Sequence, residues 1–232
     1  MNEYEKSIIN ILNEIHTHNI LDAFSDFVEI SALAIWNQVA SGEDKEKAAV
    51  EYLQKINLYN KAEQKKHVSM FGELVCSIEE HMERKEVTDT LGKIFSVLGS
   101  TSSRTGQFFT PAGEAGLLAS MLIDRKYLAD EIRKRGFISI KEPSCGGGVL
   151  LTAFCQKMIE AGMNPQEQLV IHANDIDRKC VCMTYLQLSL YGIPAVVTHG
   201  DALSNQVYGA RWYTPAYKMG MWKLRENGVV QW

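Results

Sequence analysis

Several features are missing from the sequence, and each absence excludes a class of protein. No run approaches about 18 consecutive apolar residues, so we expect no membrane-spanning helix. The first ten residues are charged and lack the apolar core of a secretory signal peptide. The five cysteines are odd in number and scattered, which predicts neither a disulfide framework nor a zinc site. Reduced thiols are therefore expected, as is typical of a cytoplasmic protein.

An excess of positive charge is also missing. The 24 Lys and Arg residues are outnumbered by 28 Asp and Glu residues, which gives a formal net charge of −4. A protein that coats DNA non-specifically is normally basic, so the composition excludes that class. Arg133, Lys134 and Arg135 form a local basic patch, for which the favoured interpretation is the solvated end of a helix.

Hydrophobic periodicity divides the 232 residues into two parts. Residues 1–100 carry apolar residues at helical spacing and show no strand-like alternation, which predicts an all-helical N-terminal domain. Residues 101–232 alternate between short apolar β-type runs and helical segments. The expected strands are 137–140, 169–173 and 195–198, and the expected helices between them are 149–160 and 176–191. This alternation predicts an α/β domain with a parallel sheet. Thr110 and Pro111 are expected to start a further helix, with Thr110 as its N-cap.

An acidic or glycine-rich signal follows each expected strand. Glu142 opens the segment Glu-Pro-Ser-Cys-Gly-Gly-Gly that ends at Gly148, Asp175 ends the second run, and Asp201 ends the third. Ligands of doubly wound sheets bind beyond the carboxyl ends of the strands, where glycines let them approach the backbone near a helix N-terminus. Asp175 could accept both hydroxyls of a ribose, and Asp201 could meet the amine of an adenine. A triple glycine alone is typical of a turn, but the three signals together predict a nucleoside pocket.

Four motifs resemble the signatures of N6-adenine DNA methyltransferases, especially the modification subunits of type I restriction-modification systems. Gly-Gln-Phe-Phe-Thr-Pro at 106–111 resembles their opening signature. Residues 142–148 are similar to the D/E-P-x-C-G-S-G loop of the family, with Gly147 in place of Ser. Asn-Asp-Ile-Asp at 174–177 and Gly-Asp-Ala-Leu at 200–203 resemble the motifs after the second and third strands. The resemblance covers roughly residues 104–204, and the order and spacing of the motifs also match.

This resemblance implies a Rossmann-like core that binds S-adenosylmethionine (SAM) and methylates adenine N6 in DNA. The methionine and adenine side of SAM would be lined by Phe108, Thr110 and Pro111. The amino-acid part would be surrounded by Glu142, Cys145, Gly146 and Gly148. The ribose would be held by Asp175, the adenine face by Ile176, and the adenine amine by Asp201. For Phe108 and its neighbour Phe109, packing in the core is the alternative interpretation.

The catalytic tetrapeptide of the family, N/D/S-P-P-Y/F/W, has no clear copy, because the sequence contains no Pro-Pro pair. In the family, this motif accepts hydrogen bonds from the adenine amine, and its aromatic residue stacks on the flipped base. The nearest candidate is Thr-Pro-Ala-Tyr at 214–217, with Thr214, Pro215 and Tyr217 as the candidate catalytic residues. An ordinary turn with aromatic packing is the alternative, since residues 209–213 are not expected to form the preceding strand.

Three hypotheses of function remain open at this point. The chain is an active DNA methyltransferase of restriction-modification or mobile-element type. Alternatively, it is a SAM-binding subunit or decoy without catalysis, which partners a complete methyltransferase, a specificity subunit or a restriction complex. In the third hypothesis only the helical part functions, as a protein-interaction domain beside a vestigial pocket. A homodimer or partner interface is a further hypothesis, which depends on the exposure of the aromatic residues near the end, namely Trp212, Tyr213, Tyr217, Trp222 and Trp232.

Overall fold

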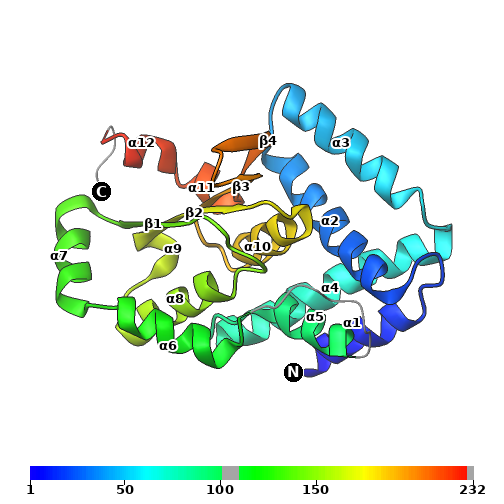
Figure 1. Cartoon of the computed structure of the whole chain (residues 1–232), viewed down its shortest axis with the longest axis horizontal. Coiled ribbons are helices and arrows are strands. Elements are labelled where there is room, and N and C mark those ends of the chain that lie inside the picture. Colours follow the sequence, from blue (N-terminus) through cyan, green and yellow to red (C-terminus); the bar gives the residue numbers. More distant parts are fainter. Residues whose placement is uncertain (101–109, 229–232) are drawn as a thin grey trace.

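The computed structural model describes residues 1–100 and 110–228 (Figure 1). Its first part is helical, as predicted, and consists of α1 (Glu3–Asn13), α2 (Ile20–Val39), α3 (Glu43–Ile56), α4 (Lys61–Glu83) and α5 (Thr90–Ser100). Three of these helices begin after an asparagine whose side-chain oxygen accepts a backbone N–H of the first turn, namely Asn2, Asn19 and Asn60. α2 is apolar on most of its surface, and it packs at the centre of this part against its neighbours. No described helix combines the length and apolar character needed to span a membrane.

The second part alternates between helices and strands. Its helices are α6 (Ala112–Leu122), α7 (Arg125–Arg135), α8 (Val149–Glu160), α9 (Pro165–Gln168), α10 (Arg178–Leu190), α11 (Pro215–Met219) and α12 (Trp222–Glu226). Its strands are β1 (Ile138–Glu142), β2 (Leu169–Asp175), β3 (Ala195–Asp201) and β4 (Gln206–Tyr213). They form one sheet in the order β1-β2-β3-β4. β1, β2 and β3 run parallel, with α8 and α10 in the two connections between them, which confirms the predicted Rossmann-like α/β core.

Two local expectations were wrong. Residues 209–213 belong to β4, which returns antiparallel to β3. Most of β4 is exposed, so it lacks the apolar run by which a buried strand is recognised. The expected start of α6 was displaced by one residue: Pro111 occupies the N-cap position, Ala112 is the first helical residue, and no side chain caps this end.

The two faces of the sheet are covered unequally. On one face, Ile171 and Val197 belong to the main core, together with side chains of α8 and α10. On the other face, Val170 and Val196 pack against Trp222 of α12 near the amino-terminal ends of the strands. The rest of this second face opens into a cavity. This opening is unusual, because parallel sheets are normally covered on both faces.

One hydrophobic core extends over both parts of the chain. α2 packs along α10, and the ring of Trp36 stacks on that of Trp212 with 5.9 Å between centroids. Arg178 of α10 also bridges to the helical part, with Nε 3.2 Å from Oε1 of Glu29 and Nη2 2.6 Å from Oε2 of Glu51. The division into domains at 1–100 and 101–232 stays a prediction.

Candidate cofactor site

The glycine-rich loop turns the chain sharply from β1 into α8. The backbone N–H of Cys145 donates to the carbonyl oxygen of Asn174 at 2.8 Å, and that of Gly148 donates to the carbonyl of Cys145 at 2.9 Å. Gly148 is the N-cap of α8 and has a φ of 96°, a conformation that strongly favours glycine. A Cβ at this position would also lie 3.0 Å from Oγ1 of Thr184. The loop therefore holds backbone N–H groups and a helix N-terminus at the carboxyl end of β1.

Asp175 joins this loop to the end of β2. Its carboxylate is buried, with 8% of the residue exposed. Oδ2 accepts the backbone N–H of Gly146 at 2.8 Å, and Oδ1 accepts that of Asp177 at 2.9 Å. A carboxylate offers about four acceptor sites, so two remain for a pair of hydroxyl groups. Beside it, Ile176 is 63% exposed and presents an apolar surface on which a flat ring could pack.

Asp201 ends β3, and the loop that follows binds its side chain. Oδ1 accepts the backbone N–H of Leu203 at 2.9 Å, and Oδ2 accepts the hydroxyl of Ser204 at 2.8 Å. The Ser204 hydroxyl is the main reason why the pKa of Asp201 lies below its usual value. The carboxylate is therefore held ionised at the surface, as an acceptor for an amine.

Asn174 ties the three strand ends together. Its Nδ2 donates to the carbonyl oxygens of Pro143 at 3.1 Å and Gly200 at 2.9 Å. Gly200 is required there, because a Cβ would lie 2.4 Å from the carbonyl oxygen of Gln206. The structural role of Asn174 was not predicted, although the residue lies in one of the four motifs.

The buried side of α10 contributes two further contacts that sequence reasoning missed. Oγ1 of Thr184 donates to the carbonyl oxygen of Gly146 at 2.9 Å, and Nε2 of Gln187 donates to that of Gly147 at 2.8 Å. Gln187 Nε2 also lies 2.9 Å from Oδ1 of Asp89, just before α5. The glycine-rich loop is thus held by α10 and, through Gln187, by the helical part.

Cys145 is buried among these residues, and burial is the main reason why the pKa of its thiol is raised. It therefore stays a neutral thiol rather than a nucleophilic thiolate. Thr110 and Pro111 are exposed at the start of α6. The predicted contacts of Phe108 fall outside the described residues. Within residues 1–100 and 110–228, no three His, Cys, Asp or Glu side chains cluster as metal ligands would.

The candidate catalytic residues lie at the other end of the sheet. Thr214 Oγ1 accepts the backbone N–H of Ala195 at 2.9 Å and donates to the carbonyl of Ile193 at 2.8 Å. These contacts are at the start of β3, whereas Asp201 is at its end, about 20 Å away at roughly 3.3 Å per residue. The structure therefore does not bring Thr214 together with the cofactor residues.

The side chains of this segment have structural partners instead. Thr214 is the N-cap of α11, and Pro215 is its first residue. Tyr217 is 5% exposed, and its hydroxyl donates to Oε2 of Glu226 at 2.9 Å. A ring buried in this way cannot stack on a base. The alternative interpretation, an ordinary turn with aromatic packing, describes these contacts. The expectation of exposed aromatic residues near the end was wrong for Tyr217, Trp212 and Trp222, which are buried within the chain.

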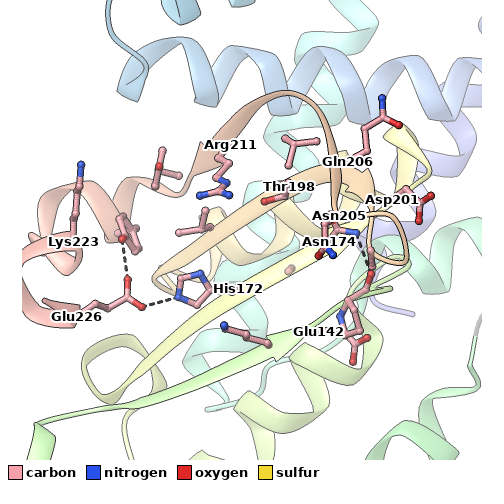
Figure 2. Close-up of a pocket in the computed structure, with 18 of the residues that line it drawn as sticks. Glu142, His172, Asn174, Thr198, Asp201, Asn205, Gln206, Arg211, Lys223 and Glu226 are labelled. Atoms are coloured by element: carbon pink, nitrogen blue, oxygen red, sulfur yellow. Dashed lines mark hydrogen bonds and ion pairs between the residues drawn. The ribbon is translucent and has the colours of Figure 1, made fainter.

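A cavity of about 740 Å³ lies on the second face of the sheet (Figure 2). It is lined by residues of all four strands and of α11 and α12. Of the predicted cofactor residues it contacts Glu142 and Asp201, at the carboxyl ends of β1 and β3. The glycines of the loop and Asp175 are outside its lining, because Asp175 faces the side of the sheet that packs on α8 and α10.

A comparison with protein-family models supplies the family. The model described as N-6 DNA methylase matches residues 86–214, more than half of the chain. The chain belongs to the N-6 DNA methylase family. SAM is the cofactor of this family and supplies a methyl group bonded to a sulfonium sulfur. The glycine-rich loop, the spare acceptor sites of Asp175 and the exposed Ile176 are chemically suited to such a nucleoside.

Among solved structures, the chain is similar to a Listeria monocytogenes protein assigned to the class I SAM-dependent methyltransferases. The two are 17% identical, with a TM-score of 0.39, and the match covers 91% of this chain. The chain spans 57% of the length of that protein. No curated protein sequence matches the chain.

Proposed function

We propose that the chain binds SAM at the carboxyl ends of β1, β2 and β3, and that this site serves the N6 methylation of adenine in DNA. The observation that carries the proposal is the bond from Gly146 N–H to Asp175 Oδ2 at 2.8 Å. It joins the glycine-rich loop and the ribose-binding candidate in one rigid unit while leaving acceptor sites free. The family match supports the choice of DNA adenine as the substrate.

In this proposal, each cofactor residue that the structure describes has a role that its surroundings permit. Asp175 accepts the ribose hydroxyls, Ile176 packs on the adenine, and Asp201 accepts the adenine amine. The amino-acid part of SAM lies against Glu142, Cys145, Gly146 and Gly148. Phe108, Thr110 and Pro111 line the remaining side, as the family signature implies.

A second candidate function is SAM binding without methyl transfer by this chain alone. It is favoured by the positions of Thr214 and Tyr217, which are buried at the amino-terminal end of the sheet. The group that positions the adenine would then come from a partner, such as a complete methyltransferase or a specificity subunit. The two candidates share the cofactor site and differ only in whether methyl transfer needs a second chain.

The test measures methyl transfer from labelled SAM to unmethylated DNA, together with SAM retained by the same sample. Asp175→Asn is the diagnostic variant, because its amide would turn a donor toward the N–H of Gly146 or Asp177. We expect it to weaken SAM binding at least tenfold, which corresponds to about 1.4 kcal/mol. The matched control is Asp124→Asn, which makes the same change in an exposed helix cap that contacts Tyr127 N–H.

Each outcome separates the candidates. Label recovered as N6-methyladenine would support an active enzyme. Retained SAM without transferred label would support a subunit that needs a partner. If the wild-type protein retains no SAM, or if Asp175→Asn and Asp124→Asn bind it equally, the proposed cofactor site is wrong.

A further inference from the structure

We propose that the cavity on the second face of the sheet binds phosphate groups of the DNA backbone. This inference rests on the proposed function, because it assigns a surface to the DNA substrate of that site. The three cations that carry it, Lys141, Arg211 and Lys223, lie outside the four motifs, and the inference begins from the side chains that the strand register brings together.

The strand register places polar side chains in two rows across this face. The first row consists of Lys141, His172 and Val196, which pair in turn across β1, β2 and β3. The second row contains Asn174, Thr198 and Arg211, which pair in turn across β2, β3 and β4. These rows leave this part of the face polar and open to the cavity.

Three cationic side chains line the cavity: Lys141 of β1, Arg211 of β4 and Lys223 of α12. All three are exposed, and none makes an ion pair with any residue that the structure describes. The basic patch on α7 differs in this respect, because Arg133 pairs with Asp130 at 2.8 Å and Lys134 with Glu131 at 3.2 Å. The cavity is therefore lined by three cations that make no ion pair among the described residues, together with the three carboxylates Glu142, Asp201 and Glu226.

The three carboxylates that line the same cavity already accept hydrogen bonds from other residues. Two of them, Glu142 and Asp201, lie at the carboxyl ends of their strands. Glu226 accepts the Tyr217 hydroxyl and lies 2.6 Å from Nε2 of His172. Asp201 is bonded within its own loop, and Glu142 accepts the backbone N–H of Ser144 at 3.1 Å. Figure 2 shows Arg211 over the middle of the cavity, with Asp201 and Glu142 on one side and Lys223 on the other. An anion would be attracted to the middle of the face and repelled from the cofactor edge.

The width of the face favours a polyanion over a single small anion. β1 and β4 are three inter-strand spacings apart, or about 14 Å at roughly 4.8 Å each. One DNA strand carries a phosphate about every 3.4 Å along the helix axis, so several phosphates would lie within this width. Thr198, Asn205 and Gln206 add neutral polar groups of the kind that hydrogen-bond to phosphate oxygens. A bound backbone would cross the middle of the face at Arg211, beside the edge that carries Asp201 and the proposed SAM site.

The test uses the full chain with saturating SAM and measures binding of a fluorescent DNA duplex by anisotropy over a range of salt concentrations. The diagnostic variant combines Lys141→Gln, Arg211→Gln and Lys223→Gln. The matched control combines Arg133→Gln, Lys134→Gln and Arg135→Gln, which removes the same charge from the α7 patch. We expect the cavity variant to bind DNA at least tenfold more weakly, with a salt slope smaller by about 2 to 3, since each lost phosphate contact lowers it by about 0.9.

The controls make the outcomes distinct. If both variants lose DNA affinity equally, the loss is an effect of net charge and the inference is wrong. The inference is also wrong if the cavity variant binds DNA as tightly as the wild type. Arg211→Gln alone, at an exposed position, gives the same comparison if the triple variant does not fold. Inorganic phosphate that displaces the duplex at low millimolar concentration would identify a site for a single phosphate and contradict the backbone assignment. SAM retention is measured in each sample, and a wild-type protein that retains no SAM would refute the proposed function instead.

Discussion

At the scale of single residues, the carboxamide of Gln187 connects the two parts of the chain at the cofactor loop. Its Oε1 accepts the backbone N–H of Leu91 in α5 at 3.0 Å, and its Nε2 donates both to Gly147 and to Asp89. Gln187 is fully buried, and burial raises the pKa of Asp89. Every polar atom of this amide therefore has a partner, and removing it leaves several buried groups without one.

We expect Gln187→Met to lower the free energy of unfolding by about 2–4 kcal/mol, because each buried group left unpaired costs about 1–3 kcal/mol. We also expect it to weaken SAM binding several-fold, because Gly147 loses a contact that positions the loop. Chemical denaturation and SAM titration measure the two effects. The control is Gln54→Met on the exposed surface of α3. Lower stability with unchanged SAM affinity would show that Gln187 supports the fold but does not position the loop.

The residue scale also explains which site residues could be predicted from the sequence. Glu142, Asp175 and Asp201 each end a short β-type run, so the run marks their places at the sheet edge. Gln187 has no such mark, because α10 is buried on most of its surface and shows no polar face from which to recognise it. Arg211 lies on a strand that was not predicted, so its place in the cavity could not be foreseen.

At the scale of elements, Glu63 in the first turn of α4 holds the turn between α1 and α2. Its Oε1 accepts the backbone N–H groups of His16 at 2.8 Å and Thr17 at 3.2 Å, and its Oε2 accepts from Asn60 at 2.8 Å. These bonds, and above all that from the Thr17 hydroxyl, lower the pKa of Glu63 to about 2. Stabilisation by a carboxylate with a lowered pKa is present above its unfolded pKa and is lost as the pH falls through the folded value.

We expect Glu63→Gln to destabilise the protein by about 1–3 kcal/mol at pH 7, because its amide nitrogen would face the donor of Asn60. The difference from wild type should shrink as the pH falls from about 4.5 to about 2, where the wild-type carboxylate takes up its proton. Urea denaturation over this pH range measures it. Glu43→Gln, at the exposed start of α3, is the control. A difference that stays constant with pH would contradict the assigned role of the carboxylate.

Elements with a strong apolar period were predictable, and those that depend on tertiary contacts were not. The bounds of α8 match the expected helix 149–160 because its apolar residues and the preceding glycines mark both its start and its face. α11 and α12 have five residues each, and they are stabilised by packing of Tyr217 and Trp222 on the second face of the sheet. Segments this short carry too few residues for a periodic pattern.

At the scale of the whole molecule, the helical part and the sheet share one core, and Trp36 lies where they meet. Its ring stacks on Trp212 of β4 with planes 9° apart, and it meets Tyr185 of α10 edge-on with 6.3 Å between centroids. A cation–π contact lies at the same junction, where the guanidinium of Arg178 is 4.9 Å from the centre of the Trp212 ring. An interface formed by buried aromatic rings couples the stabilities of the two parts.

From this shared core we expect the two parts to unfold in a single transition, even if 1–100 and 101–232 are separate domains in origin. Hydrogen exchange of peptides from α2 and from β2 should report the same midpoint in denaturant. Trp36→Ala removes the central ring and should lower stability by about 3–5 kcal/mol, whereas Val68→Ala on the exposed side of α4 should change it little. If the wild-type peptides unfold at different denaturant concentrations, the core does not couple the parts. The domain boundary would then be a boundary of folding as well. A single wild-type transition that divides into two in Trp36→Ala would instead identify this aromatic junction as the source of the coupling.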